Sequence, residues 1–173
     1  MPALKRLLDL VSTAAAWVAG LATVLMMLHV TADAVGRAVF NSPITGTVEI
    51  VSAYHMAALA FLPLALITRD RGHIIVELFT GWMKFRPRTL LDACVGVVTV
   101  VYTGVFAWKA VEIAVAKTAI REAKEAGTGF VQIWPSRWLV AIGFGLMAIY
   151  LVIQVARDFR AGLTAERPAE PKR

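Results

Sequence analysis

Three titratable residues stand in or beside long apolar runs, and they are the first candidates for chemistry. Glu49 lies near the start of the apolar run 48–67, and His29 and His55 lie within apolar stretches. Ionisable groups inside a membrane are costly and often mark ion or proton pathways. Glu49 is therefore a candidate for the proton-coupling acid of a small, self-sufficient exporter. The two histidines are candidates for the axial ligands of a haem.

Glu49 also has a simpler interpretation, as a residue in the first turn of a helix. A carboxylate there is favoured by the helix dipole, and Thr45 or Thr47 can cap the same helix. A coupling carboxylate is expected deeper, facing a polar cavity. The short turn between the first two apolar runs can bring Arg37 close to Glu49, so the sequence predicts a structural ion pair between them. Arg37 can also pair with Asp33, which lies four residues earlier on one helical face.

The histidines likewise have a commoner role than ligation. They lie at similar depth on neighbouring predicted helices, and neither helix carries the string of small residues that a buried porphyrin usually requires. A histidine that hydrogen-bonds a neighbouring helix is the commoner case. The sequence also lacks a phosphate-binding glycine loop, a Cys-x-x-Cys pair and a His-Glu-x-x-His motif, so it predicts no enzyme, metal or cofactor. A membrane haem protein, or the anchor of a quinone enzyme, is the alternative interpretation.

Composition places these residues in a membrane protein. Hydrophobic residues make up 58% of the chain and charged residues 17%, whereas a soluble domain is about half apolar and about a quarter charged. The net charge is +6, but the basic residues flank apolar runs instead of forming a patch with exposed aromatics. This favours membrane flanks over a nucleic-acid surface. The single cysteine, Cys94, excludes an internal disulfide.

Four apolar runs are long enough to cross a bilayer, which needs about 20 helical residues. They are predicted at residues 10–32, 48–67, 91–116 and 138–156. Pro63 lacks a backbone donor and should kink the second span. No span combines the mid-membrane acids and broken helices of a complete transporter, so the chain is expected to be an accessory subunit whose small residues pack against other helices.

The third helical pattern is longer than a bilayer requires. It runs from Leu90 to Ala126, where Gly127 is a natural terminator, and it allows Arg121 to pair with Glu125 at one helical turn. Such a helix is about 55 Å long, against a hydrocarbon core of about 30 Å. It must therefore tilt, bend or project from the membrane.

An amphipathic pattern occupies residues 73–86, between the second and third spans. On a helical wheel its apolar residues share one face and its polar residues the opposite face. This predicts a helix in the cytoplasmic-side interface, with cations beside lipid headgroups; a short solvent loop is the alternative. The predicted lipid-interface residues are Trp82, Lys84, Phe85 and Arg88.

The predicted fold is thus an all-α integral membrane protein with four transmembrane helices plus this interfacial helix. Residues 1–160 form the membrane domain, and residues 161–173 form a charged, proline-containing tail that is expected to be disordered. With four spans, both termini and the middle loop lie on one side. Twelve of the 18 lysines and arginines fall there, so the positive-inside rule places both termini in the cytoplasm.

Three segments carry a resemblance that covers most of the chain: DAVGRAVFNSPITGTVEI, RDRGHIIVELF and VQIWPSRWLVAIGFGLMAIYL. They contain an arginine after the first span, a Pro-x-x-Gly-x-x-Glu entry to the second, a Gly-His-Ile turn, and a proline that opens the fourth. In this order and spacing, the sequence resembles the small membrane subunit, of the DctQ type, of a tripartite ATP-independent periplasmic transporter. The resemblance extends from about Leu7 to Asp158.

The resemblance implies an importer of three parts in the bacterial inner membrane. A periplasmic binding protein captures an organic acid anion, and a large membrane subunit holds the substrate and sodium sites. The small subunit braces that carrier and is expected to transport nothing alone. The expected partners are therefore the large subunit, the binding protein and membrane lipids, but no nucleic acid. Candidate contacts with the binding protein, on the segments predicted to face the periplasm, are Ser42, Thr45, Trp134 and Arg137.

Overall fold

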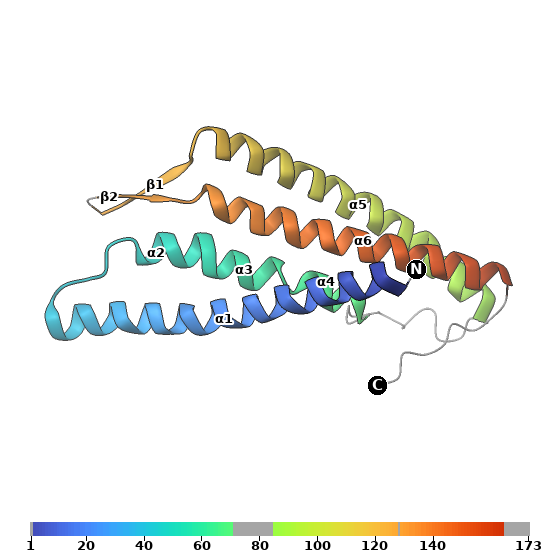
Figure 1. The fold of residues 1–173 in the computed structure, drawn as a ribbon, viewed down its shortest axis with the longest axis horizontal. Helices are drawn as coiled ribbons and strands as arrows, with labels where there is room; N and C mark the ends of the chain where they lie inside the picture. The colour runs from blue at the N-terminus through green and yellow to red at the C-terminus, as the bar shows by residue number, and fades with distance from the viewer. Residues whose placement is uncertain (1, 71–84, 128, 165–173) are drawn as a thin grey trace.

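The computed structural model describes residues 2–70, 85–127 and 129–164 (Figure 1). Its elements are α1 (Pro2–Phe40), α2 (Thr47–Ile50), the π-helix η1 (Val51–His55), α3 (Met56–Phe61), α4 (Leu64–Arg69), α5 (Phe85–Ala119), β1 (Ala123–Ala126), β2 (Gly129–Gln132) and α6 (Trp134–Thr164). The consecutive elements α2, η1, α3 and α4 form one interrupted rod, called the second rod here. Among the described residues, four helices are long and apolar enough to cross a membrane: Arg6–Phe40, Thr47–Arg69, Cys94–Ala119 and Trp134–Arg160. The predicted four-span architecture is confirmed.

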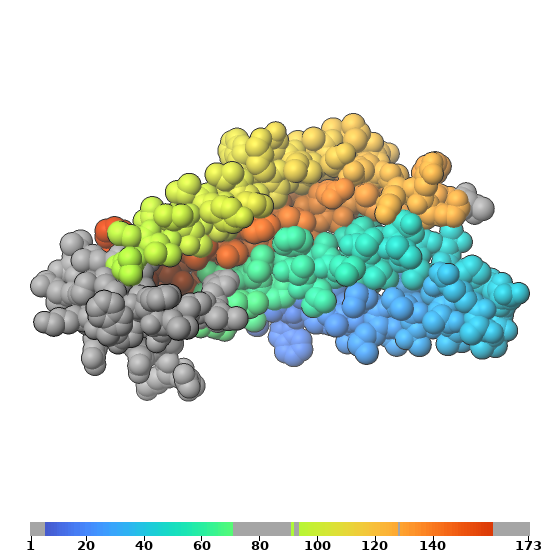
Figure 2. All heavy atoms as spheres, turned by 180° about the vertical axis from the view of Figure 1, so that it is seen from behind, coloured from blue at the N-terminus to red at the C-terminus, as the bar shows by residue number. Residues whose placement is uncertain are grey.

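The four rods lie side by side in a row instead of closing into a compact bundle. Across the row the order is α1, the second rod, α6 and α5 (Figure 1), and Figure 2 shows the same order from the opposite side. Only 11% to 22% of the most apolar window of each spanning helix is buried inside the chain. An apolar helix surface must be covered by lipid or protein, so the row leaves wide surfaces for both.

The second rod is interrupted at two places. Pro63 cannot donate a backbone hydrogen bond, and accordingly α3 ends at Phe61 and α4 begins at Leu64. The kink predicted at this proline is present as a break. The second interruption, the π-helix Val51–His55, has no signal in the sequence pattern. Single π-helical turns within α-helices are frequent at functional sites.

The third span ends earlier than its sequence pattern predicts. Arg121 has a left-handed backbone with φ of 47°, and its N–H donates to the Thr118 carbonyl at 3.1 Å. The Glu122 N–H donates to the Lys117 carbonyl at 3.0 Å. These two bonds form a Schellman motif, which satisfies the last carbonyls and stops the helix.

The residues beyond this stop form a β-hairpin. Strands β1 and β2 pair antiparallel, with Ala126 opposite Gly129. The expectation of a helix continuing to Ala126 was wrong, and so was the Arg121–Glu125 helical pair. Gly127, with φ of 59°, provides the left-handed conformation of the hairpin turn and not a helix terminus. Even so, α5 has 35 residues and is about 53 Å long, well beyond a bilayer core of about 30 Å.

The remaining predictions concern the ends of the described segments. The interfacial helix predicted at residues 73–86 falls almost wholly outside the described residues, as do Trp82 and Lys84. Phe85 and Arg88 belong to the first turns of α5, and no separate amphipathic helix occurs in residues 2–70, 85–127 and 129–164. At the other terminus α6 continues to Thr164, past the predicted start of the tail.

Candidate functional site

The turn between α1 and α2 is built around Asp33. This residue is 7% exposed, and its carboxylate accepts a hydrogen bond from the Ile44 backbone N–H at 2.8 Å. The same carboxylate forms an ion pair with Arg37 at 2.7 Å. Asp33 and Arg37 lie one helical turn apart on α1, which is the spacing at which side chains meet. Because this hydrogen bond joins α1 to the residues just before α2, Asp33 helps to fix the path of the turn.

Arg37 therefore takes Asp33 as its partner, and no ion pair joins Arg37 to Glu49 in the described part of the chain. The neighbour on the same helix face is available without bridging the turn, which explains the difference from the predicted pair. Glu49 occupies the first turn of α2, as predicted. The N-cap of α2 is Gly46, without a side-chain hydrogen bond, so the predicted threonine cap does not form.

A second carboxylate, that of Glu122, ties together the end of α5, the hairpin and the start of α6. Its side chain is 17% exposed and forms ion pairs with Lys117 at 3.1 Å and Arg137 at 3.0 Å. Its backbone carbonyl accepts hydrogen bonds from the N–H groups of Ile133 and Trp134, at 2.9 and 3.2 Å. The hydrogen bond from Arg137 lowers the pKa of Glu122 most strongly, partial burial opposes this shift, and Lys117 adds to the lowering. Glu122 is therefore held as a carboxylate.

The α1–α2 turn and the hairpin lie together at one end of the rods, where α5 stops and α6 begins. A Cβ added at Gly127 would lie 3.1 Å from the Thr45 Cγ2 atom, and one at Gly46 would lie 3.0 Å from the Val131 Cγ2 atom. We call residues 41–46 together with β1 and β2 the hairpin-end surface. It is made of two segments that are distant in sequence.

The four residues predicted to contact a binding protein all lie at this end, but in different states. Ser42 and Thr45 are exposed on the hairpin-end surface. The Trp134 indole N–H donates to the Gln132 side-chain carbonyl at 3.2 Å. The Arg137 guanidinium is engaged by Glu122. The serine and threonine are therefore the more accessible members of the set.

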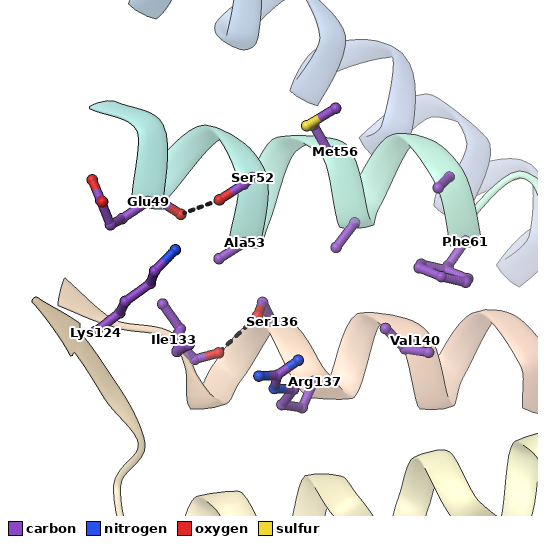
Figure 3. A pocket seen from close by; sticks show the side chains of 12 residues that line it. Glu49, Ser52, Ala53, Met56, Phe61, Lys124, Ile133, Ser136, Arg137 and Val140 are labelled. Carbon is purple, nitrogen blue, oxygen red and sulfur yellow. Dashed lines mark hydrogen bonds between the residues drawn. The ribbon is translucent and has the colours of Figure 1, made fainter. Parts of the chain in front are cut away.

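A groove runs between the second rod and α6 and begins next to the hairpin (Figure 3). It has a volume of about 680 Å³. Its hairpin end carries charged side chains, and its walls carry mostly small and apolar ones, including Ala53, Ala57 and Ala60. The charged residues at the mouth are Glu49, Lys124 and Arg137.

His29 and His55 do face each other, which the sequence left open. Their ring centroids are 5.8 Å apart and the rings are nearly perpendicular, at 84°. The Nδ1 atom of His55 is buried, and no described residue forms a hydrogen bond with it. An edge-to-face contact of this kind places one imidazole directly against the other. It is a packing contact between α1 and the second rod, and it gives the haem alternative no support.

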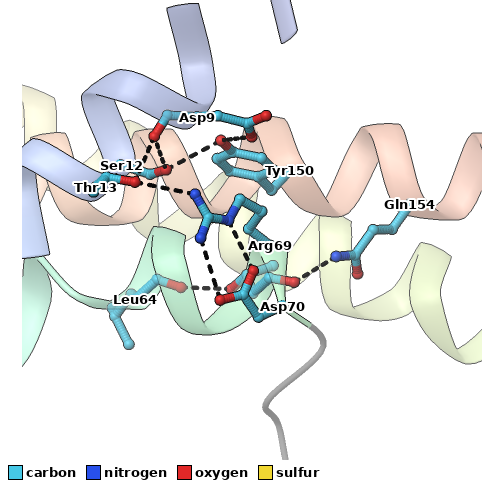
Figure 4. A network of polar contacts seen from close by, with 9 residues as sticks. Asp9, Ser12, Thr13, Leu64, Arg69, Asp70, Tyr150 and Gln154 are labelled. Atoms are coloured by element: carbon cyan, nitrogen blue, oxygen red, sulfur yellow. Dashed lines mark hydrogen bonds and ion pairs between the residues drawn. The ribbon is translucent and has the colours of Figure 1, made fainter. Parts of the chain in front are cut away.

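A polar network connects three of the rods at their other end, near the start of α1 and the end of α4 (Figure 4). The Tyr150 hydroxyl on α6 donates to the Asp9 carboxylate on α1 at 3.0 Å and lies 3.2 Å from the Ser12 hydroxyl. The Arg69 guanidinium at the end of α4 donates to the Thr13 hydroxyl at 3.1 Å. Side chains therefore hold three rods together at both of their ends: α1, the second rod and α6.

Sequence reasoning missed Glu122 and the two bridging tyrosines. Tyr150 reaches Asp9, and the Tyr54 hydroxyl donates to the Gln132 carbonyl at 2.6 Å. A tyrosine within an apolar run is itself a signal, because its buried hydroxyl needs a partner. The Glu122–Arg137 pair has no such signal, because the hairpin that brings the two residues together was read as helix.

The chain was compared with protein families and with known proteins. The family model described as the DctQ component of tripartite ATP-independent periplasmic transporters matches residues 26–161, which is more than three quarters of the 173 residues. No curated protein and no solved structure matches. The family implies a complex with a large membrane subunit and a periplasmic binding protein. The match and the four spanning helices lead to one conclusion: the chain belongs to the DctQ family and is the small, multi-pass membrane component of a tripartite transporter, not an enzyme.

Proposed function

We propose that this chain is a scaffold that braces the large subunit of a sodium-coupled importer of organic acid anions. The observation that carries the proposal is the open row of helices, in which each spanning segment buries only 11% to 22% of its apolar window. Side-chain networks connect neighbouring rods both at the hairpin end and at the end where α1 starts. An open row of helices can enlarge the membrane area that the partner occupies without forming a transport route of its own.

The two outer helices supply the faces for such a partner. Trp17 on α1 is 77% exposed, and Trp108 on α5 is 74% exposed. A Cβ added at Gly20 on α1, or at Gly104 on α5, would meet nothing within 4 Å. Small residues on an apolar face let a second helix approach closely, which is how helices associate in membranes. The large subunit is accordingly expected to pack on one or both of these edges.

Orientation is part of the proposal. The hairpin-end surface is expected to face the periplasm and both termini the cytoplasm, since the majority of lysines and arginines lie on the side of the termini. The Lys109–Glu112 ion pair on α5, at 2.8 Å, is then expected to mark where this long helix leaves the apolar layer on the periplasmic side. Both of its side chains are more than half exposed.

Bulky substitutions on the open faces test the scaffold role. We expect Gly20→Leu or Gly104→Leu, when coexpressed with the large subunit, to reduce copurification of that subunit about tenfold, because the leucine prevents close helix approach. Recovery is measured by quantitative gel analysis after affinity purification in mild detergent. Gly129→Leu is the control, since Gly129 is also open but lies in β2. Full recovery of the large subunit with both helix variants would contradict the proposed edges.

A second role, docking of the binding protein, is favoured by the hairpin-end surface. The α1–α2 turn and the hairpin are joined into one exposed surface, so a protein approaching from this side meets both. Ser42 and Thr45 are its exposed predicted contacts. This role does not conflict with the first, because the outer faces of α1 and α5 stay available to the large subunit.

Docking can be separated from assembly by titrating the binding protein. We expect Ser42→Trp to raise the binding-protein concentration for half-maximal uptake about fivefold, because the indole obstructs a close protein contact, while maximal uptake is kept. Uptake is measured in proteoliposomes that contain the whole transporter. Arg157→Trp, at an exposed position near the opposite end, serves as the control. If Ser42→Trp leaves the concentration dependence unchanged, residue 42 is not part of a docking surface.

A further inference from the structure

We propose that the groove between the second rod and α6 binds one phospholipid with an amine-bearing, zwitterionic headgroup, for which phosphatidylethanolamine is the test ligand. The headgroup is placed at the charged mouth under the hairpin, and one acyl chain is placed along the small-residue walls. The proposal rests on the shape and the length of the groove, and on two charged side chains at its mouth that have no ion partner among the described residues.

Two contacts of the second rod, one with α6 and one with β2, flank the groove. At its deep end α6 touches α3 so closely that a Cβ at Gly143 would fall against the Phe61 backbone. Toward the hairpin, the Tyr54 hydroxyl of the second rod donates to the Gln132 carbonyl of β2 at 2.6 Å. Between these two contacts the helices are separated by the side chains of Ala53 and other small residues, which leaves the groove unfilled (Figure 3).

Two opposite charges at the mouth have no ion partner among the described residues. Neither Glu49 nor Lys124 takes part in an ion pair with another described residue. Both side chains line the mouth, from different walls. Arg137 also lines it, but its guanidinium is already bound by Glu122. A carboxylate and an ammonium placed this way complement a headgroup that carries both an ammonium and a phosphate.

The length of the groove corresponds to one membrane leaflet. From Glu49 to Phe61 the second rod rises about 18 Å, at about 1.5 Å per residue. Half of a hydrocarbon core is about 15 Å. A lipid whose headgroup lies beside Glu49 and Lys124 can therefore extend one acyl chain to the level of Phe61, where the groove ends.

The contact at the deep end argues against a helix of the large subunit as the occupant. A helix inserted between the second rod and α6 would have to separate the rods where Gly143 meets Phe61. A flexible acyl chain can end at this contact without separating the two rods.

Native mass spectrometry of the complete transporter, released from nanodiscs of mixed phosphatidylethanolamine and phosphatidylglycerol, tests the proposal. We expect one retained phosphatidylethanolamine for each copy of this chain. Glu49→Gln and Lys124→Gln should each reduce its retention about tenfold, as for the loss of one charge-assisted hydrogen bond. Ala57→Phe should reduce it by obstructing the groove wall without changing a charge.

Matched controls keep the result interpretable. Glu125→Gln removes a charge next to Lys124, but neighbouring residues of a strand point to opposite faces, and Glu125 does not line the groove. Ala38→Phe adds the same bulk on an exposed position of α1. Equal retention of both lipids by the unmodified transporter would overturn the proposal. So would undiminished phosphatidylethanolamine in the groove variants, or a crosslink from Ala57→Cys to the large subunit.

Discussion

Gly143→Val is expected to separate the pair formed by α6 and α5 from the pair formed by α1 and the second rod. A Cβ at this position falls against the backbone of Phe61, and backbone cannot yield as a flexible side chain can. Forcing extra atoms into a packed contact costs about 1 to 3 kcal/mol, and we expect the upper end here because α6 must move away from α3. The thermal unfolding temperature of the purified chain, measured by the loss of helical circular dichroism, should fall clearly.

The same helix provides the control for this variant. Gly145 lies two residues further along α6, and a Cβ there would meet nothing within 4 Å. Gly145→Val adds the same side chain and the same change in helix propensity, so it should leave the unfolding temperature of the isolated chain almost unchanged. Equal effects of the two valines would mean that helix propensity, and not the α3–α6 contact, decides the outcome.

Arg137→Glu is expected to release the hairpin from α6. The substitution removes two hydrogen bonds to the Glu122 carboxylate and places a second negative charge beside it. Hydrogen bonds to charged groups contribute about 1.5 to 3 kcal/mol, so we expect a loss of about 2 kcal/mol in the free energy of unfolding. Hydrogen exchange of the β1 and β2 amides should accelerate more than exchange in α1. If exchange in the hairpin does not change, the Glu122 cluster does not hold it.

The pH dependence of the same cluster has a definite sign. The pKa of Glu122 is lowered in the folded chain, so its contribution to stability is fully present above the unfolded pKa, which is about 4.3. It is lost as the pH falls through the lower, folded pKa. Glu122→Gln should therefore destabilise the chain at neutral pH but make its stability less sensitive to acid below about pH 4.3. A variant with the acid sensitivity of the unmodified chain would exclude Glu122 as its source.

The four spans were predictable because apolar length alone determines them. The break at Pro63 was also predictable, because the missing N–H acts locally. The hairpin was not, since residues 120–126 keep a helical pattern and the Schellman motif depends on Arg121 taking a left-handed backbone that arginine rarely adopts. The error at the hairpin also concealed Glu122, whose partner Arg137 is near only once the strands pair.

The order of the rods was likewise beyond the sequence pattern. Hydropathy indicates which segments enter a membrane but not which helices are neighbours. Individual contacts determine which helices are neighbours, such as those of Gly143 with Phe61 and of Tyr150 with Asp9. Arg37 illustrates the same point: two carboxylates were within its predicted reach, and the one on its own helix face became its partner.

The cation dependence of uptake by a Glu49→Gln transporter tests the central claim most directly. Glu49 was the one sequence candidate for a coupling acid, and it lies in the first turn of α2 at the mouth of a groove. If the chain is a scaffold, a fully assembled Glu49→Gln complex in proteoliposomes should show the same sodium and proton dependence of uptake as the unmodified complex. Loss of cation-driven uptake in a complex that is still assembled would contradict the scaffold role of this chain.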